Sequence, residues 1–373
     1  MTKIDDKRVP ALRFKGFNDD WAQRMLGKIA VIIMGQSPDG STYSKVPSTY
    51  ILVQGNADIK NGWVKPRLWS SQSTKEAQKG DIILTVRAPV GEVAKTNYDV
   101  VLGRGVAGIR GNDFIFHLLT LMNINNYWNK FSTGSTFESI NSNDIKKAIV
   151  NIPPQLEQGK IGKLLNTLNN LIALQQRKLE QLKSIKKAML QKLFVNKDMP
   201  ILHFKGFNNI WKRSKLGNIT KTISSKPYIS GAYEEGKYEV VQQGDHPIAG
   251  YSNDIPFKNY KDVTLFGDHT LSLFKPRKAF LIASDGIKIL SPSVTMDSLF
   301  YYYLLEKYKP RSEGYKRHFS ILKKSVALFP VSINEQTQIA HVLIIIDKTI
   351  SLQQERIEKL RNYKRFLLQN MLI

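Results

Sequence analysis

Two parts of this sequence occur twice. The first is an opening segment with aromatic residues and glycine, which reads Pro10-Ala-Leu-Arg-Phe-Lys-Gly-Phe-Asn18 with Trp21 and Leu26-Gly27, and returns in the second half as Pro200-Ile-Leu-His-Phe-Lys-Gly-Phe-Asn208 with Trp211 and Leu216-Gly217. The second is a closing segment, which reads Glu157-Gln158 with Leu174-Gln-Gln176, then Glu335-Gln336 with Leu352-Gln-Gln354. Each half of the chain therefore opens and closes with the same segments.

The segments between these repeats share little sequence. They span about 130 residues in the first half and about 115 in the second. A duplicated frame with two different inserts predicts two domains that present different recognition surfaces, and 373 residues suffice for two hydrophobic cores. We expect a first recognition domain at 1–152, a spacer helix at 153–196, a second recognition domain at 197–330 and a second spacer helix at 331–373.

The chain is strongly basic, and its charge points to a polyanionic partner. It has 55 Lys and Arg against 31 Asp and Glu, a formal net charge of +24. Nucleic acid is the usual partner of such a surface, although a Lys-rich composition from an A/T-rich genome is the alternative. The absence of cysteine excludes disulfides, thiol nucleophiles and cysteine-ligated zinc. Because no stretch resembles a signal peptide or membrane span, we expect a cytoplasmic protein.

Short β-branched runs between Gly, Pro, Asn or Ser predict strands in both inserts. The expected strands are Ile29–Met34, Tyr50–Val53, Asp81–Val86, Val100–Leu102, Tyr238–Gln243, Val263–Phe266, Ala279–Ile282 and Ile287–Leu290. Helices are expected over His117–Phe131, Asn141–Lys147 and Asp297–Tyr308. The fold class is therefore α/β (α+β), with two globules that have β-rich centres.

Two long helices are expected to close the halves. Apolar residues recur with heptad spacing from Glu157 to Phe194 and again in the second closing segment, without proline. Polar residues interrupt the two seams at matching positions, which are Gln175 and Lys186, then Gln353 and Lys364. Each helix would be about 57 Å long at 1.5 Å per residue. Matching interruptions favour two seams that face each other over two independent surface helices.

Chain connectivity favours an antiparallel pair of helices with pseudo-two-fold symmetry. If the ends of the helices lie in line, Gln175 and Gln353 meet near the symmetry axis, where two amides can satisfy each other and fix the register. The alternative is that both glutamines face solvent at the edge of the seam.

These features together resemble the specificity (S) subunits of type I restriction–modification systems. The resemblance rests on the two opening segments, on the helix starts at Pro153-Pro154 and Pro330, and on strings inside the inserts. Those strings are Lys79-Gly-Asp-Ile-Ile-Leu-Thr85, Arg87, Val90-Gly91, Gly103-Arg104, Leu265-Phe-Gly-Asp268 and Ser284-Asp-Gly286. The match covers essentially the whole chain.

The resemblance implies a subunit without a catalytic site or cofactor of its own. It would bind double-stranded DNA, two methyltransferase (M) subunits and, in the restriction complex, two endonuclease/translocase (R) subunits. Its two target-recognition domains would read the halves of a split, asymmetric site, and the helices would set the unread gap. S-adenosylmethionine for adenine-N6 methylation would be held by the M subunits, and ATP and Mg²⁺ by the R subunits.

Polar side chains in strand-connecting loops are the candidates for reading DNA. Arg and Lys can contact guanine, and Asn and Gln can contact adenine, in the major groove. The candidates in the first domain are Gln54, Asn56, Lys60, Arg67, Arg87 and Arg104. Those in the second are Gln242, Gln243, His246, Lys258, His269 and Lys288. For each residue, a solvated charge or a fold-supporting turn is an equally good interpretation.

Two other classes of function stay open. Pro38-Asp39 followed by Asp58-Ile-Lys60 has the loose spacing of a metal-dependent nuclease, which motivates a stand-alone nicking or DNA-modifying enzyme. Asn151-Ile-Pro-Pro-Gln155 departs from the methyltransferase motif and fits a helix start better. The six histidines show no ligand spacing, although Asp245-His246 and Asp268-His269 could suggest a metal. A coiled-coil DNA-binding adaptor without M partners is the third possibility.

Overall fold

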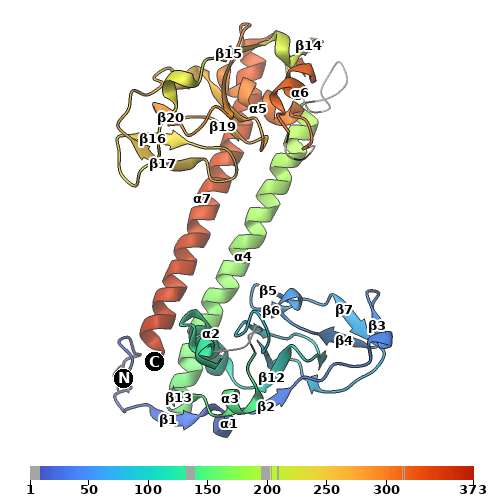
Figure 1. The fold of residues 1–373 in the computed structure, drawn as a ribbon, viewed down its shortest axis with the longest axis vertical. Helices are drawn as coiled ribbons and strands as arrows, with labels where there is room; N and C mark the ends of the chain where they lie inside the picture. The colour runs from blue at the N-terminus through green and yellow to red at the C-terminus, as the bar shows by residue number, and fades with distance from the viewer. Residues whose placement is uncertain are drawn as a thin grey trace. The chain divides into compact units, whose positions relative to one another are not determined.

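The computed structural model describes residues 9–131, 139–194, 202, 204–207, 210–312, 314 and 316–373. Most of the polar leader, and Pro200 and His203 of the second opening segment, lie outside these residues. Contacts divide the chain into unit 1, Met1–Arg177 with Glu355–Ile373, and unit 2, Lys178–Gln354. Each unit has a β-rich part and segments of two long helices, α4 (Gln155–Leu193) and α7 (Ile333–Met371) (Figure 1). Because this boundary falls inside the helices, the expected four-part division stays a prediction.

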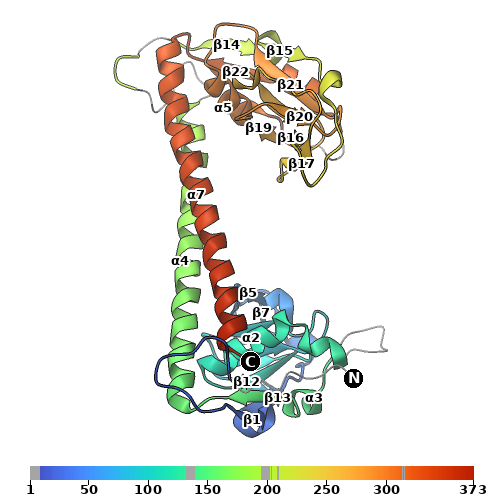
Figure 2. The same cartoon turned by 90° about the vertical axis from the view of Figure 1, so that its left-hand side faces the viewer.

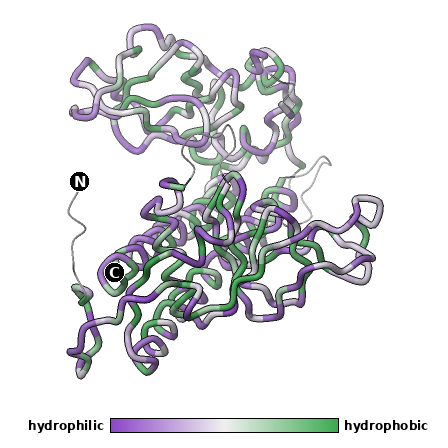
Figure 3. The backbone as a smooth tube through the Cα atoms, turned by 60° about the horizontal axis from the view of Figure 1, so that its bottom comes forward, coloured by the Kyte–Doolittle hydropathy of each residue, from purple (hydrophilic) through white to green (hydrophobic). Residues whose placement is uncertain are grey.

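Two sheets form the β-rich part of unit 1. The first has six strands in the order β2 (Val31–Met34), β12 (Val106–Arg110), β9 (Ile82–Thr85), β10 (Val93–Lys95), β6 (Trp63–Val64) and β5 (Ile59–Lys60). The second has five, in the order β3 (Tyr43–Ser44), β7 (Leu68–Ser70), β4 (Tyr50–Val53), β11 (Val100–Leu102) and β8 (Glu76–Ala77). Figure 3 shows hydrophobic stretches running through this region.

Strand β9 is buried on both faces and so joins two cores. Ile83 packs with Val53 and Leu102 of the second sheet. Its neighbours Ile82 and Leu84 point to the other face, as strand geometry requires, and pack against the helices. Those helices are α2 (Asp113–Ile124) and the first half of α4. An unbroken apolar run in a central strand thus reflects its position between two layers.

Unit 2 repeats this plan with fewer strands. A four-stranded sheet has the order β15 (Thr220–Ile223), β21 (Ile287–Pro292), β18 (Thr264–Gly267) and β19 (Leu273–Phe274). A three-stranded sheet has the order β17 (Ile248–Ser252), β16 (Tyr238–Val241) and β20 (Phe280–Ile282). Helices α5 (Ser298–Tyr308) and α6 (Phe319–Lys324) pack between this part and α7, where Phe300 and Leu343 share one buried cluster.

In both units a short two-stranded sheet ties the start of the insert to its end. In unit 1, β1 (Ala22–Met25) pairs antiparallel with β13 (Ile149–Ile152), between the short helices α1 (Leu26–Ile29) and α3 (Ser142–Lys146). In unit 2, β14 (Lys212–Lys215) pairs with β22 (Val326–Phe329) in the same way. Each insert therefore begins and ends at a two-stranded sheet that both units have.

The helix starts are anchored to the opening segments. Arg13 makes a two-fold ion pair with the buried Glu157, with N–O distances of 2.7 and 2.9 Å. In unit 2 the matching Glu335 accepts a hydrogen bond from Trp211 Nε1 at 3.1 Å. Each repeated glutamine binds a proline carbonyl just before its helix, because Gln158 donates to Pro153 O at 2.8 Å and Gln336 to Pro330 O at 2.7 Å.

Within each unit, segments of α4 and α7 run antiparallel (Figures 1 and 2). In unit 1 the start of α4 lies beside the end of α7, since Leu12 N–H donates to Asn370 O at 2.7 Å next to the Arg13–Glu157 pair. In unit 2 Lys186 pairs with Asp347 at 2.8 Å. The expected fold class, with β-rich globules and two antiparallel coiled-coil helices of 39 residues each, is confirmed.

Most of the expected elements begin or end at residues other than those expected, and two of these differences have a clear physical cause. Helix α2 begins at Asp113 because Asn112 accepts the N–H of Ile115 as a cap, and it ends at Ile124 before a separate turn of helix at Tyr127–Phe131. The strand expected from Ile29 begins at Val31 because residues 26–29 form α1, which buries Leu26. No described helix is long and apolar enough to cross a membrane.

Candidate nucleic-acid interface

A buried carboxylate shapes the loop that follows β4. Asp58 is 1% exposed and accepts hydrogen bonds from the backbone N–H groups of Gln54 at 2.8 Å and Gly55 at 3.3 Å. Its other oxygen accepts from Arg67 Nε at 3.0 Å. Both oxygens are thus used to hold the loop, which explains this aspartate without a metal ion.

Four of the candidate residues in the first domain meet at one hollow. Gln54, Asn56, Arg87 and Arg104 line a cavity of about 240 Å³ together with Ser37, Gly55, Ala88 and Gly105. The two arginines are exposed. Arg104 is held by its backbone, whose N–H donates to Ser37 Oγ at 3.1 Å. Segments far apart in the sequence therefore present two guanidinium groups and two amides at one place.

Two glycines allow this close approach. A Cβ atom at Gly105 would lie 2.1 Å from Gln54 O, and one at Gly103 would lie 3.0 Å from Gln54 Cγ. Any larger residue would push the Gln54 loop away from Arg104. The string Gly103-Arg-Gly105 thus positions the arginine by letting two loops touch.

The other two candidates of this domain lie elsewhere. The side chain of Arg67 is 53% exposed, but its Nε is bound to Asp58. Lys60 is an exposed residue of β5 and lines a separate, larger cavity beside the long helices. Asp39, the other carboxylate of the nuclease hypothesis, accepts two hydrogen bonds from Ser41, which lower the pKa of Asp39. Neither Arg67 nor Lys60 belongs to the hollow.

In unit 2 the candidates cluster around the turn after β16. Gln242 closes this turn, since its N–H donates to Pro247 O at 2.8 Å and its Nε2 to His246 O at 2.9 Å. Gln243 accepts the N–H of His269 at 3.0 Å and packs on Gly286, where a Cβ atom would lie 2.3 Å from its Nε2. The structure thus joins Gln242 to His246 and Gln243 to His269.

The remaining residues of unit 2 have other surroundings. Lys288 donates to Asp285 O at 2.7 Å, and Lys258 is exposed in the segment after β17. The buried Asp268, once a possible metal ligand, accepts the N–H of Phe319 at the start of α6 at 2.7 Å. Among the described residues no group of three His, Asp or Glu has the geometry to hold a metal ion.

Both seam glutamines are buried. Gln175 is 9% exposed and Gln353 is 6% exposed, so the alternative in which they face solvent is wrong. The two residues belong to different units, and their pairing stays a prediction.

Sequence reasoning did not find Ser37, whose hydroxyl fixes the backbone of Arg104. It lies 67 residues away from Arg104, in a run of small polar residues that looks like an ordinary turn. No local signal marks it, because its role depends only on the packing of two distant loops.

Known proteins share the fold of this chain. Solved structures with the same fold include the S subunit of a type I restriction–modification system from M. genitalium, with a TM-score of 0.69 and 15% identity over 98% of this chain and 99% of that one. A chain from a study of complex assembly and conformational transition in a type I system has a TM-score of 0.52 and 19% identity, with 93% and 96% covered.

Two similar sequences come from Methanocaldococcus jannaschii. The putative type I restriction enzyme MjaX specificity subunit is 32% identical over 187 residues, which are 48% of this chain and 44% of the relative. The MjaIX specificity subunit is 24% identical over 291 residues, 65% and 63% of the two chains. The chain thus spans less than two thirds of either relative.

The model of the type I restriction modification DNA specificity domain matches residues 18–184 and again 208–362, one match on each repeat, and the chain therefore belongs to that family.

Proposed function

We propose that this chain is the non-catalytic DNA-specificity subunit of a type I restriction–modification complex and that it reads a bipartite, asymmetric DNA site. The observation that carries the proposal is one frame built twice around different loops. The helix-start residues Glu157 and Glu335 and the closing strand pairs repeat, whereas most of the sequence of the two inserts does not. Each unit would then read its own half-site.

The chemistry of the hollow in unit 1 supports base reading. A guanidinium can bind guanine O6 and N7 in a bidentate manner, and an amide can bind adenine N6 and N7. Arg87 and Arg104 supply the guanidinium groups, and Gln54 and Asn56 supply the amides from a loop fixed by Asp58. In unit 2 the turn at Gln242–Pro247 offers His246 in a comparable place after a strand.

Partner binding is the second part of the proposal. Exposed apolar residues recur at equivalent positions of the repeat on α4 and α7, as Leu174 with Leu352 and Ile185 with Tyr363, with exposed fractions between 47% and 66%. Exposed apolar residues at matching positions suit two copies of one partner. We assign these copies to M subunits, with S-adenosylmethionine bound there for adenine-N6 methylation. Two R subunits would bring ATP and Mg²⁺, and the complex would act in the cytoplasm.

The test is the methylated motif in cells that express this chain with its M subunit. Replacing residues 30–140 by the matching insert of a relative should change one half of the motif and leave the other half and the gap length intact. A change in both halves would overturn the modular interpretation. Failure of the parental chain to co-purify with the M subunit would favour the adaptor, and turnover by the purified chain alone that Asp58→Ala abolishes would favour the enzyme.

A further inference from the structure

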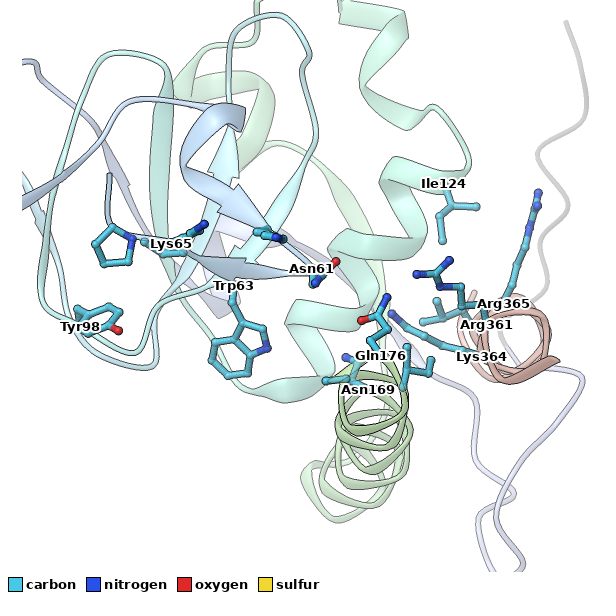
Figure 4. A pocket seen from close by; sticks show the side chains of 16 residues that line it. Asn61, Trp63, Lys65, Tyr98, Ile124, Asn169, Gln176, Arg361, Lys364 and Arg365 are labelled. Atoms are coloured by element: carbon cyan, nitrogen blue, oxygen red, sulfur yellow. The ribbon is translucent and has the colours of Figure 1, made fainter. Parts of the chain in front are cut away.

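A large basic cavity of unit 1 lies between the β5–β6 turn and the two long helices (Figure 4). Its volume is about 760 Å³. Asn61 and Gly62 have φ of 54° and 76°, the left-handed values that a tight two-residue hairpin requires, and so place Lys60 and Trp63 on its wall. The opposite wall comes from α4 and α7, with Asn169 and Gln176 on the first and Arg361, Lys364 and Arg365 on the second.

Positive charge in this cavity has no acidic counterpart. Five cationic residues line it, namely Lys60, Lys65, Arg361, Lys364 and Arg365, and none of the described lining residues is Asp or Glu. Lys364 is half-buried and reaches from α7 towards α4 (Figure 4). Burial lowers the pKa of Lys364, because no described carboxylate lies close enough to compensate for the lost hydration. The cavity therefore holds a partly dehydrated cation.

In the second copy of the repeat, the lysine at this position forms ion pairs within its own unit. Lys186 on α4 is the repeat equivalent of Lys364 and lines the corresponding cavity of unit 2. Its Nζ pairs with Glu306 at 2.9 Å and Asp347 at 2.8 Å. Burial lowers the pKa of Lys186, but the two carboxylates outweigh that effect and raise it. The repeat equivalent of Asp347 in unit 1 is Asn169, so this carboxylate is missing beside Lys364.

Two acidic residues close to this part of unit 1 have other partners. A smaller neighbouring cavity shares Lys364 and includes Glu92, which accepts from Asn123 at 3.3 Å. Asp113 is paired with Lys95. Neither carboxylate forms an ion pair with Lys364 in the described part of unit 1. Unit 1 therefore leaves open a site that unit 2 fills with its own residues.

Depth and wall chemistry decide what kind of group fits. The phosphates of a DNA duplex reach cations on an open surface, whereas Lys364 is half-buried among the residues that line the cavity. Apolar surface from Trp63, Ile124, Ile172 and Leu368 surrounds the cations, which suits a slender acidic side chain with an apolar neighbour. Unit 2 itself shows that this lysine position accepts carboxylates.

We propose that the cavity at Lys364 binds an Asp or Glu side chain of a protein partner, which we take to be the M subunit on the basis of the proposed function. The partner would supply to unit 1 the carboxylate that Glu306 and Asp347 supply within unit 2. The two otherwise similar units would thereby differ in how tightly they hold their partners.

The test compares the parent chain with four variants, Lys364→Met, Lys364→Arg, Lys186→Met and Lys163→Met, the last being an exposed lysine on α4 as a control. Binding to the purified M subunit is measured by calorimetry at fixed salt. We expect Lys364→Met to weaken binding at one of two sites by about 30-fold or more, because a charge pair excluded from water is lost, and Lys364→Arg to restore much of it. Lys163→Met should bind like the parent.

Thermal unfolding of the free chain gives a second readout. Lys364→Met removes an uncompensated buried charge and should raise the melting temperature, whereas Lys186→Met leaves two carboxylates unpaired and should lower it. A lower melting temperature for Lys364→Met would overturn the open-site argument. Unchanged M binding by Lys364→Met also overturns the proposal if the parent binds, whereas a parent that binds no M subunit refutes the proposed function instead.

Two further outcomes identify a different occupant. If Lys364→Met weakens binding of duplex DNA and leaves M binding unchanged, the site takes a DNA phosphate and the proposal fails. If inorganic phosphate stabilises the parent but not Lys364→Met, and M binding is unchanged, the site takes a small anion, which also overturns it.

Discussion

Asp58 should control both the stability of unit 1 and the reading of its half-site. Asp58→Ala removes the acceptor for the N–H groups of Gln54 and Gly55 and the partner of Arg67. Hydrogen bonds to a charged acceptor contribute about 1.5–3 kcal/mol each, and the 3.3 Å bond to Gly55 belongs at the low end. Because the Arg67 side chain is 53% exposed, its ion pair adds only about 0–1 kcal/mol. The free energy of unfolding should therefore fall by about 3–5 kcal/mol.

The functional consequence should be confined to one half of the motif. Without Asp58 the loop no longer holds Gln54 and Asn56 at the hollow, and the loss of one amide–adenine contact costs about 1–3 kcal/mol of discrimination. Denaturant unfolding measures the stability, and sequencing of methylated genomic DNA measures the motif. Asp39→Ala is the matched control, because Asp39 caps an exposed turn outside the hollow and its loss should leave the motif unchanged. An Asp58→Ala chain as stable as its parent, or one with an unaltered motif, would refute this reasoning.

Three other predictions concern the helices and their packing. Inserting four residues after Gln176, about 6 Å of helix, should lengthen the unread gap by one or two base pairs; an altered half-site with an unchanged gap would contradict it. Gln175→Leu combined with Gln353→Leu should raise the melting temperature and loosen gap-length discrimination in the methylated sites, and lower stability would argue against an amide pair that fixes register. His117 is hydrogen-bonded to Asn166, and burial lowers the pKa of its imidazole from 6.5 to about 4. The stability that the neutral imidazole contributes is therefore complete above about pH 6.5 and is lost as the pH falls towards 4. Between pH 7 and 5 the loss should be about 2 kcal/mol, and His117→Gln should flatten that part of the pH–stability curve in denaturant titrations.

The long helices and most central strands could be predicted because their signals are local. A heptad seam is visible within one helix, and an apolar β-branched run such as Tyr50–Val53 marks its own strand. The closing pair β1–β13 could not be predicted in this way. Its first strand, Ala22–Met25, is exposed throughout and has no β-branched residue, and it becomes a strand only through a partner at the far end of the insert.

The candidate site was predictable in residue type but not in arrangement. Sequence context predicts four polar loop residues, Gln54, Asn56, Arg87 and Arg104, and the fold brings all four to one hollow. The same features also predict Arg67 and Gln243, which hold loops through Asp58 and His269 instead. Residue type shows that a side chain can bind a base, whereas only packing shows whether its hydrogen-bonding atoms are already used.

The unequal units explain why a duplicated chain suits an asymmetric target. A symmetric dimer presents identical surfaces and so matches a palindromic site. Here the repeated residues include Glu157 and Glu335, which anchor the helix starts to the opening segments and so build the frame. The residues that differ lie in the loops and at the cavities around Lys186 and Lys364. Because the two copies are joined in one chain, the loops of one copy can change without altering the frame of the other. For the same reason the lysine in one cavity can be paired by carboxylates of its own unit, while the lysine in the other stays open for a partner.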